Sequence, residues 1–288
     1  MKNRKIWIGV GAFFLAGSGG PFPVAASDVQ AVSDVQAAAP EARHTDLHAR
    51  LMAQAAATFG QAGEGGEGGE AGIDAEAAAT DPVQYGVALQ VIAAHFHAGL
   101  AAYEGKEQEA GAQMFAHGLS EVYVAMEDVF KKLGVRDLGP KLEAAVAAAV
   151  EKKPVADVKR KAKAVFSALA AAERKGPTSK ASAQAVQAKV AAELLDRAAA
   201  QYAVVQKDQN LEAYLDGLGF AIAARKQAKS ASRYLKGVDS KKEAALRQAV
   251  TLAGQAYPGI NRPAQPRVSL TELQSSASAA RLAVSNLP

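Results

Sequence analysis

The sequence contains no cysteine and few aromatic residues, and both shortages narrow the class of protein. Without thiols, the 288-residue chain cannot form disulfides, zinc–thiolate sites, cysteine-bound iron–sulfur clusters or a covalent haem of the CxxCH type. Aromatic residues make up 6% of the chain, whereas alanine, which has the highest helix propensity, supplies 68 residues. The composition therefore predicts an all-α protein, long enough for one large or two small domains with a real core.

Long apolar runs are also scarce, and the one at the N-terminus has the layout of a secretory signal peptide. Three positive charges lie in residues 1–5, and an apolar run follows over residues 6–17. This run is shorter than the roughly 17–25 apolar residues of a membrane anchor. The small residues before Ser27 place cleavage after Ala26. We therefore expect residues 1–26 to be removed and the mature chain, without a membrane span, to be exported, to the periplasm in a Gram-negative source.

The formal net charge of +4 suggests nucleic acid as a partner, but its distribution argues against this. Removal of residues 1–26 takes away three basic residues and leaves a mature net charge of +1. Residues 27–133 hold 16 Asp/Glu against 5 Lys/Arg, whereas residues 134–288 hold 13 against 25. This polarity fits two mutually attracting lobes, an acidic lobe that concentrates cations beside a basic docking lobe, or simply solvated helix faces.

Changes in composition and periodicity divide the mature chain into three parts. Residues 27–80 are predicted to be a flexible segment, with a tandem SDVQA motif, one helix over 41–59 and a Gly/Glu linker. Residues 81–257 are predicted to form an antiparallel helical bundle, and residues 258–288 a proline-containing tail with a short helix. The total is about eight to nine helices. After the linker, the first expected helix starts at Pro82. The further expected helices cover 106–133, with an interruption at Gly118, 138–151, 155–174, 182–206, 211–236, 241–256 and 271–284.

Histidines are the first candidates for chemistry, and every one lies in the acidic half: His44, His48, His95, His97 and His117. Chemistry is therefore expected within residues 41–128. In an unbroken helix, the i, i+4 spacing places His117 and Glu121 on one face, with Met114 about 60 degrees away. Imidazole, carboxylate and thioether together suit iron or copper.

Two alternatives remain for this group. The apolar stripe that should face the core lies nearly opposite it, which would leave His117 and Glu121 as a solvated pair. Alternatively, Gly118 breaks the helix and Ser120 caps a new one, in which case the angular relation no longer applies. The apolar stripe consists of Phe115, Leu119, Val122, Met126 and Leu133.

His95 and His97 lie on opposite flanks of the apolar stripe that contains Phe96. They cannot both point to one place, because each is about 100 degrees from Phe96 on a helix. Gly99 leaves space beside His95, so His95 is the expected inward ligand and His97 a residue at the rim. A core histidine that is hydrogen-bonded to a neighbour is the alternative for His95.

Other catalytic patterns are weak or missing. Glu41 and His44 match one Glu-x-x-His unit of a di-iron bundle, but the second unit is missing, so a carboxylate-bridged metal oxidase is a minor alternative. His44 and His48 form a further i, i+4 pair. There is no P-loop, Gly-x-Ser-x-Gly elbow or His-Glu-x-x-His motif. We therefore expect a protein that is not an enzyme.

Two segments carry a resemblance to known proteins. The segments LLDRAAAQY (194–202) and EAYLDGLGF (212–220) resemble a helix pair in the periplasmic domains of bacterial ferrotransporter-type iron permeases. The Gly/Glu linker, followed by His95 and then His117 with Glu121, also resembles a group of exported, uncharacterised proteobacterial helical proteins. The permease's membrane helices and paired-Glu motif are missing here. The resemblance therefore implies accessory iron handling and not transport.

These observations lead to one hypothesis and one rival. The hypothesis is an exported, periplasmic helical protein that binds iron or copper as an accessory in metal uptake or handling, with a membrane transporter or another periplasmic protein as partner. The rival is a non-catalytic interaction module whose charge polarity docks a partner protein or a membrane surface. The expected metal ligands are His95, His117 and Glu121, assisted by Met114 or His97.

Overall fold

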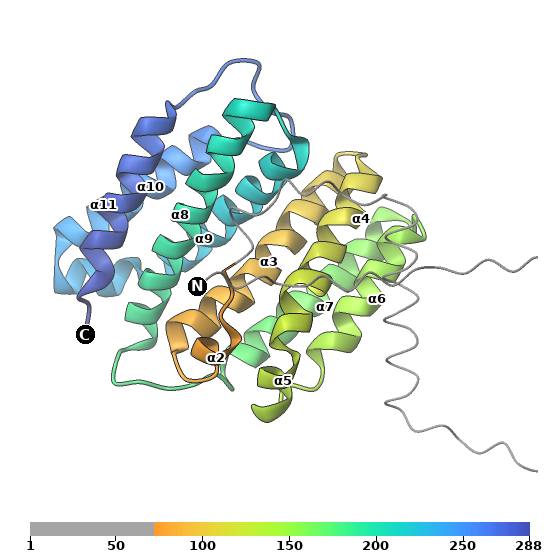
Figure 1. Ribbon diagram of the computed structural model, residues 1–288, viewed down its shortest axis with the longest axis horizontal. Helices are drawn as coiled ribbons and strands as arrows, with labels where there is room; N and C mark the ends of the chain where they lie inside the picture. Colours follow the sequence, from red (N-terminus) through yellow and green to blue (C-terminus); the bar gives the residue numbers. More distant parts are fainter. Residues whose placement is uncertain (1–71) are drawn as a thin grey trace, which may run out of the picture. The chain divides into compact units, whose positions relative to one another are not determined.

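The computed structural model describes residues 72–288, and this part of the chain contains helices and no β-strand (Figure 1). The predicted all-α class and helical bundle are thereby confirmed. Several predictions lie outside the described residues: the signal peptide with cleavage after Ala26, the tandem motif, the helix over 41–59 with His44 and His48, and the Gly/Glu linker up to residue 71.

Helix boundaries within the described part lie close to those expected from the positions of proline, glycine and capping residues. Six helices begin after an Asp, Ser or Asn whose side chain accepts a hydrogen bond from a backbone N–H of the first turn. The helices are α2 (Ala75–Ala78), α3 (Pro82–Glu104), α4 (Gln108–His117), the π-helix η1 (Gly118–Tyr123), α5 (Val124–Lys132), α6 (Leu138–Val150), α7 (Val155–Glu173), α8 (Ala183–Asp208), α9 (Leu211–Val238), α10 (Ser240–Ala256) and α11 (Leu270–Ser285).

Helix α3 is the centre of the bundle. It contacts α4, α7, α8 and α9, and in Figure 1 it runs between α8–α11 on one side and α4–α7 on the other. By length and composition it is apolar enough to cross a membrane, but 72% of its most apolar stretch is buried inside the protein. The core helix of a bundle has this composition because it is covered on all sides.

The helix expected within residues 258–288 is α11, which packs against α8 and α10. Its buried face includes Leu273, Ala277 and Val284. Tyr202 on α8 donates a hydrogen bond of 2.8 Å to the carbonyl of Val268, immediately before α11. The C-terminal residues thus take part in the core of the bundle.

The chain does not break at Gly118. Helices α4 and α5 are joined by the π-helix η1, so residues 108–132 follow one continuous helical path. Ser120 does not cap a new helix, because its Oγ donates to the carbonyl of Ala116, one turn earlier. π-Helical turns inside α-helices are frequent at functional sites, and here the π-helix begins directly after His117.

Three glycines let neighbouring backbones approach α3 closely. A Cβ at Gly219 on α9 would lie 2.4 Å from the carbonyl oxygen of Ala94 on α3. A Cβ on Gly111 of α4 would lie 2.7 Å from the carbonyl oxygen of Gly99, and one on Gly99 would lie 2.5 Å from the Phe115 ring. Since no larger residue fits without moving backbone, these contacts determine how closely α4 and α9 pack on α3.

Substitution of Gly219 tests the α3–α9 contact. We expect Gly219→Ala to lower the free energy of unfolding by roughly 1–3 kcal/mol, because the new methyl group meets fixed backbone. Gly254→Ala in α10 is the matched control, since a Cβ there would meet nothing within 4 Å. The control should raise stability by up to about 1 kcal/mol. Urea unfolding of both variants measures this, and a Gly219→Ala protein as stable as wild type would contradict the packing argument.

Candidate metal centre

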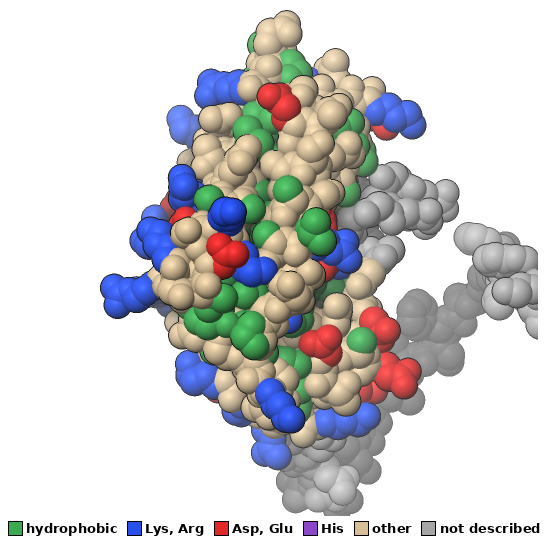
Figure 2. Space-filling model, turned by 90° about the vertical axis from the view of Figure 1, so that its left-hand side faces the viewer, with side chains coloured by type: hydrophobic (Ala, Val, Ile, Leu, Met, Phe, Trp, Pro, Cys, Tyr) green, Lys and Arg blue, Asp and Glu red, His purple; other side chains and the backbone are tan. Residues whose placement is uncertain are grey.

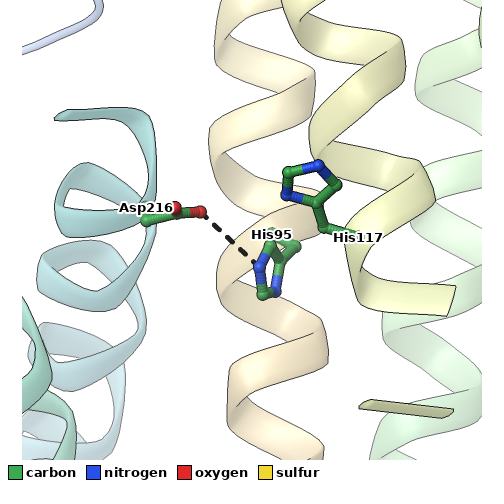
Figure 3. A group of neighbouring side chains, drawn as sticks. All are labelled: His95, His117 and Asp216. Atoms are coloured by element: carbon green, nitrogen blue, oxygen red, sulfur yellow. Dashed lines mark ion pairs between the residues drawn. The ribbon is translucent and has the colours of Figure 1, made fainter. Parts of the chain in front are cut away.

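Three side chains from three helices converge inside the bundle. His95 comes from α3, His117 from the last residue of α4, and Asp216 from α9 (Figure 3). Each offers one ligand atom, and these atoms lie within 4.8 Å of one another. The residues are 1%, 8% and 5% exposed, respectively. This buried group of two imidazoles and a carboxylate can hold a metal ion.

The ring of His95 is oriented by its own helix. Its Nδ1 donates a hydrogen bond of 2.9 Å to the carbonyl of Val91, one turn earlier. This bond places the proton of a neutral imidazole on Nδ1 and turns Nε2 toward Asp216, whose Oδ1 lies 3.5 Å away (Figure 3). Metal-binding histidines commonly donate their second nitrogen to a carbonyl in this way, which fixes the tautomer needed for ligation.

The close helix contacts described above lie next to these residues. Gly219, which contacts Ala94, is three residues beyond Asp216, and Ala94 directly precedes His95. Gly118, which directly follows His117, would bring a Cβ to 3.3 Å from the Cβ of His95. Small residues therefore bring α3, η1 and α9 together at the level of the site.

His117 also faces two glutamates. Its Nδ1 lies 3.5 Å from Oε1 of Glu212 on α9 and 3.8 Å from Oε1 of Glu121 on η1. Gln113, one turn before His117, donates a hydrogen bond of 3.3 Å to Oε2 of Glu212. The glutamate side chains are 34% and 38% exposed, so they lie on the solvent side of the centre.

The surroundings of the centre are apolar and aromatic. The rings of His95 and His117 meet edge to face at 6.0 Å, and Phe220 packs edge-on against His95 at 6.3 Å. Burial, together with the nearby charges that include Asp216, raises the pKa of Tyr257 well above its ordinary value. Tyr257 therefore stays a neutral phenol and donates a hydrogen bond of 2.8 Å to the Ala198 carbonyl.

The spacing of the ligand atoms suits a first-row metal ion. Bonds of about 2.1 Å to nitrogen and oxygen place two ligands of a tetrahedral ion about 3.4 Å apart. The His95–Asp216 separation of 3.5 Å matches this value and exceeds the usual 2.7–2.9 Å of a charge-assisted hydrogen bond. Because the ligand atoms spread over up to 4.8 Å, closure around one ion requires side-chain shifts of about 1 Å.

The remaining predicted ligands occupy different positions. Met114 is 1% exposed and belongs to the hydrophobic core. His97 lies against α7 and α9: its ring stacks on Phe166 at 4.3 Å, and Lys226 Nζ donates to its Nε2 at 3.0 Å. Glu121 reaches the edge of the centre beside His117. The alternative in which His117 and Glu121 form a solvated pair holds only for Glu121, which is exposed, because His117 is buried.

Asp216 is the residue that sequence reasoning missed. It lies in the basic half of the chain, outside residues 41–128, where chemistry was expected. The signal in the sequence is a single carboxylate in an otherwise apolar and glycine-containing run, LDGLGF, because a buried charge on a core helix requires a partner. Its imidazole partner could not be identified without knowing which helices pack together.

Comparisons with protein-family models, with curated proteins and with solved structures found no match to this chain. The resemblance to iron-permease domains therefore stays a prediction.

The acid stability of the protein tests the position of His97. Burial, with the nearby charges of Lys226 and Arg225, lowers the pKa of His97 to about 3. An unfolded histidine titrates near 6.5, so between pH 6.5 and 3 the unfolded state binds the extra proton and wild-type stability falls. In His97→Phe, the metal-free protein should lose stability less steeply over this interval, by roughly 1 kcal/mol per pH unit. Urea unfolding at a series of pH values measures the slope, and equal slopes would contradict the assignment.

Proposed function

We propose that this protein binds one divalent transition-metal ion through His95, His117 and Asp216 and acts in metal handling. The observation that carries the proposal is the convergence of two imidazoles and a carboxylate from three helices in a buried position. A buried carboxylate is stabilised by a nearby positive charge, and a metal ion bound between Asp216 and the two imidazoles would supply one.

The donor set favours iron in its ferrous form. Two histidines and one carboxylate, with further coordination positions open, are typical of non-haem Fe(II) sites, and the same set also binds zinc and cupric copper. Cuprous copper prefers thiolate or thioether ligands, and the chain has no cysteine. Iron is therefore the first metal to test, with copper(II) as the second.

A role in storage or delivery fits this site better than a dinuclear oxidase. A carboxylate-bridged di-iron centre needs two histidines and about four carboxylates around two ions. Within residues 72–288 one group of three potential ligands has its atoms within 4.8 Å of one another, and that group contains a single carboxylate. Three protein ligands leave positions for water or for a ligand from a partner, which is what transfer of an ion requires.

We place this function outside the cytoplasm, as an accessory to metal uptake, on the basis of the predicted leader peptide and the resemblance to iron-permease domains. The basic half of the chain supplies a surface for docking a transporter, another periplasmic protein or an anionic membrane. Figure 2, which views the side where α10 and α11 lie, shows Lys and Arg side chains spread across that face. Exposed basic residues of α9 and α10 include Lys229, Arg233, Lys236, Lys241 and Arg247.

Metal titration of the mature chain tests the proposed function. Wild-type protein should bind one equivalent of Fe(II) under anaerobic conditions, or of Co(II) as a spectroscopic probe, and its Tm should rise with metal concentration. Asp216→Asn and His95→Ala should each weaken binding by at least about tenfold, because each removes a ligand from a three-residue set. Calorimetry and the ligand-field absorption of Co(II) measure these changes.

His97→Phe is the matched control for this titration, since His97 is the other histidine of α3 and lies against α7 and α9. It should bind metal as wild type does. If His95→Ala/Asp216→Asn binds Fe(II) and Co(II) as tightly as wild type, the proposed centre is wrong.

A further inference from the structure

Two carboxylates, those of Glu121 and Glu212, lie on the solvent side of the centre. Each is four residues from one of the inner ligands. Glu212 precedes Asp216 by one turn of α9, and Glu121 follows His117 by four residues along η1. Residues four apart share a face of an α-helix such as α9, and Glu121 lies 3.8 Å from His117 across the start of η1, so each glutamate extends the set of ligands outward. The exposed fraction of the side chain rises along α9 from 4% at Asp216 to 34% at Glu212.

The imidazole of His117 lies between the inner ligands and the outer pair. Figure 3 shows its ring together with the ring of His95 and the carboxylate of Asp216. Its Nδ1 also lies 3.5 Å from Glu212 and 3.8 Å from Glu121. The hydrogen bond from Gln113 holds Oε2 of Glu212, while Oε1 faces His117. The buried side chain of His117 thus lies within 4.8 Å of the Asp216 carboxylate and within 3.8 Å of both glutamates.

We propose that Glu121, Glu212 and His117 form an outer binding position, through which a divalent cation passes to the inner position of His95, His117 and Asp216. This inference rests on the proposed function, because the ion it describes is the one bound at the inner centre. His117 is a ligand in both positions. The ion therefore keeps the His117 imidazole as a ligand while it leaves the glutamates and binds Asp216 and His95.

The physical advantage of an outer position is the stepwise loss of water. A divalent cation that moved directly into a buried site would have to lose most of its hydration shell at once, at a high cost in free energy. Partly exposed carboxylates attract the hydrated ion and replace some of its waters first. The ion then meets the buried imidazole and carboxylate with fewer waters left to lose.

The rate of metal binding distinguishes an outer position from a simple inner site. In stopped-flow mixing with Co(II), Glu121→Gln/Glu212→Gln should associate roughly tenfold more slowly than wild type, because the attractive carboxylates are gone. Its stoichiometry should stay at one equivalent, and its final ligand-field spectrum should match that of wild type, since the inner ligands are intact. If the double variant does not fold, Glu121→Gln alone gives the same test with a smaller effect. The Glu121 side chain is 38% exposed, so this change leaves the core intact.

Glu107→Gln/Asp128→Asn is the matched control. It removes two exposed acidic charges beside α4 and on α5, away from His117 in the chain, and should associate nearly as fast as wild type. Equal rates for Glu121→Gln/Glu212→Gln and wild type would overturn the outer position. Equal slowing by the control would also overturn it, because general electrostatic attraction would then explain the rate.

The outcomes also separate this inference from the proposed function. If wild type binds no Co(II), both fail. If wild type binds one equivalent and Asp216→Asn loses it, but the glutamate variant is as fast as wild type, only the outer position fails. Complete loss of binding in the glutamate variant would make the glutamates final ligands and would overturn passage from one position to the other.

Discussion

Close backbone packing around α3 is the constraint on which the rest of the structure depends. Gly219 lies against the Ala94 carbonyl, Gly111 lies against the Gly99 carbonyl, and Gly118 packs beside His95. Alanine-rich helices bury little surface per residue, so their backbones must approach closely to make a dense core. The side chains that project where α3, η1 and α9 meet are therefore held at short distances from one another.

Burial of polar groups at this junction has a cost that an apolar core would avoid. His95, His117 and Asp216 are each less than 10% exposed, and ordinary hydrophobic residues would stabilise the same volume more simply. Three potential ligands at one buried position support the proposed function, because clusters of buried ionisable groups are common at functional sites. The π-helix beside His117 is a second departure from regular structure at the same place.

Much of the fold could be predicted from local patterns. The helix starts expected at 82, 182 and 211 lie at or next to Asp81, Ser182 and Asn210, which cap these helices in the structure, because a helix start is decided by a few neighbouring residues. Two of the three ligands were accessible for a similar reason: His95 and His117 were recognised as rare residues at helical positions. The π-helix was not predicted, since the sequence signalled only an irregularity at Gly118.

By itself, the sequence determined the all-α class, the order and approximate limits of the longer helices and the candidate imidazoles, because these depend on residues close together in the chain. Only the tertiary structure decided which side chains meet. Asp216 joins His95 from 121 residues away, and His97, two residues from His95, faces Lys226 and Phe166 instead. The pattern of residues along one helix gives the direction of each side chain around that helix axis. A metal site also requires the relative positions of several helices, and these depend on the close packing of α4 and α9 against α3.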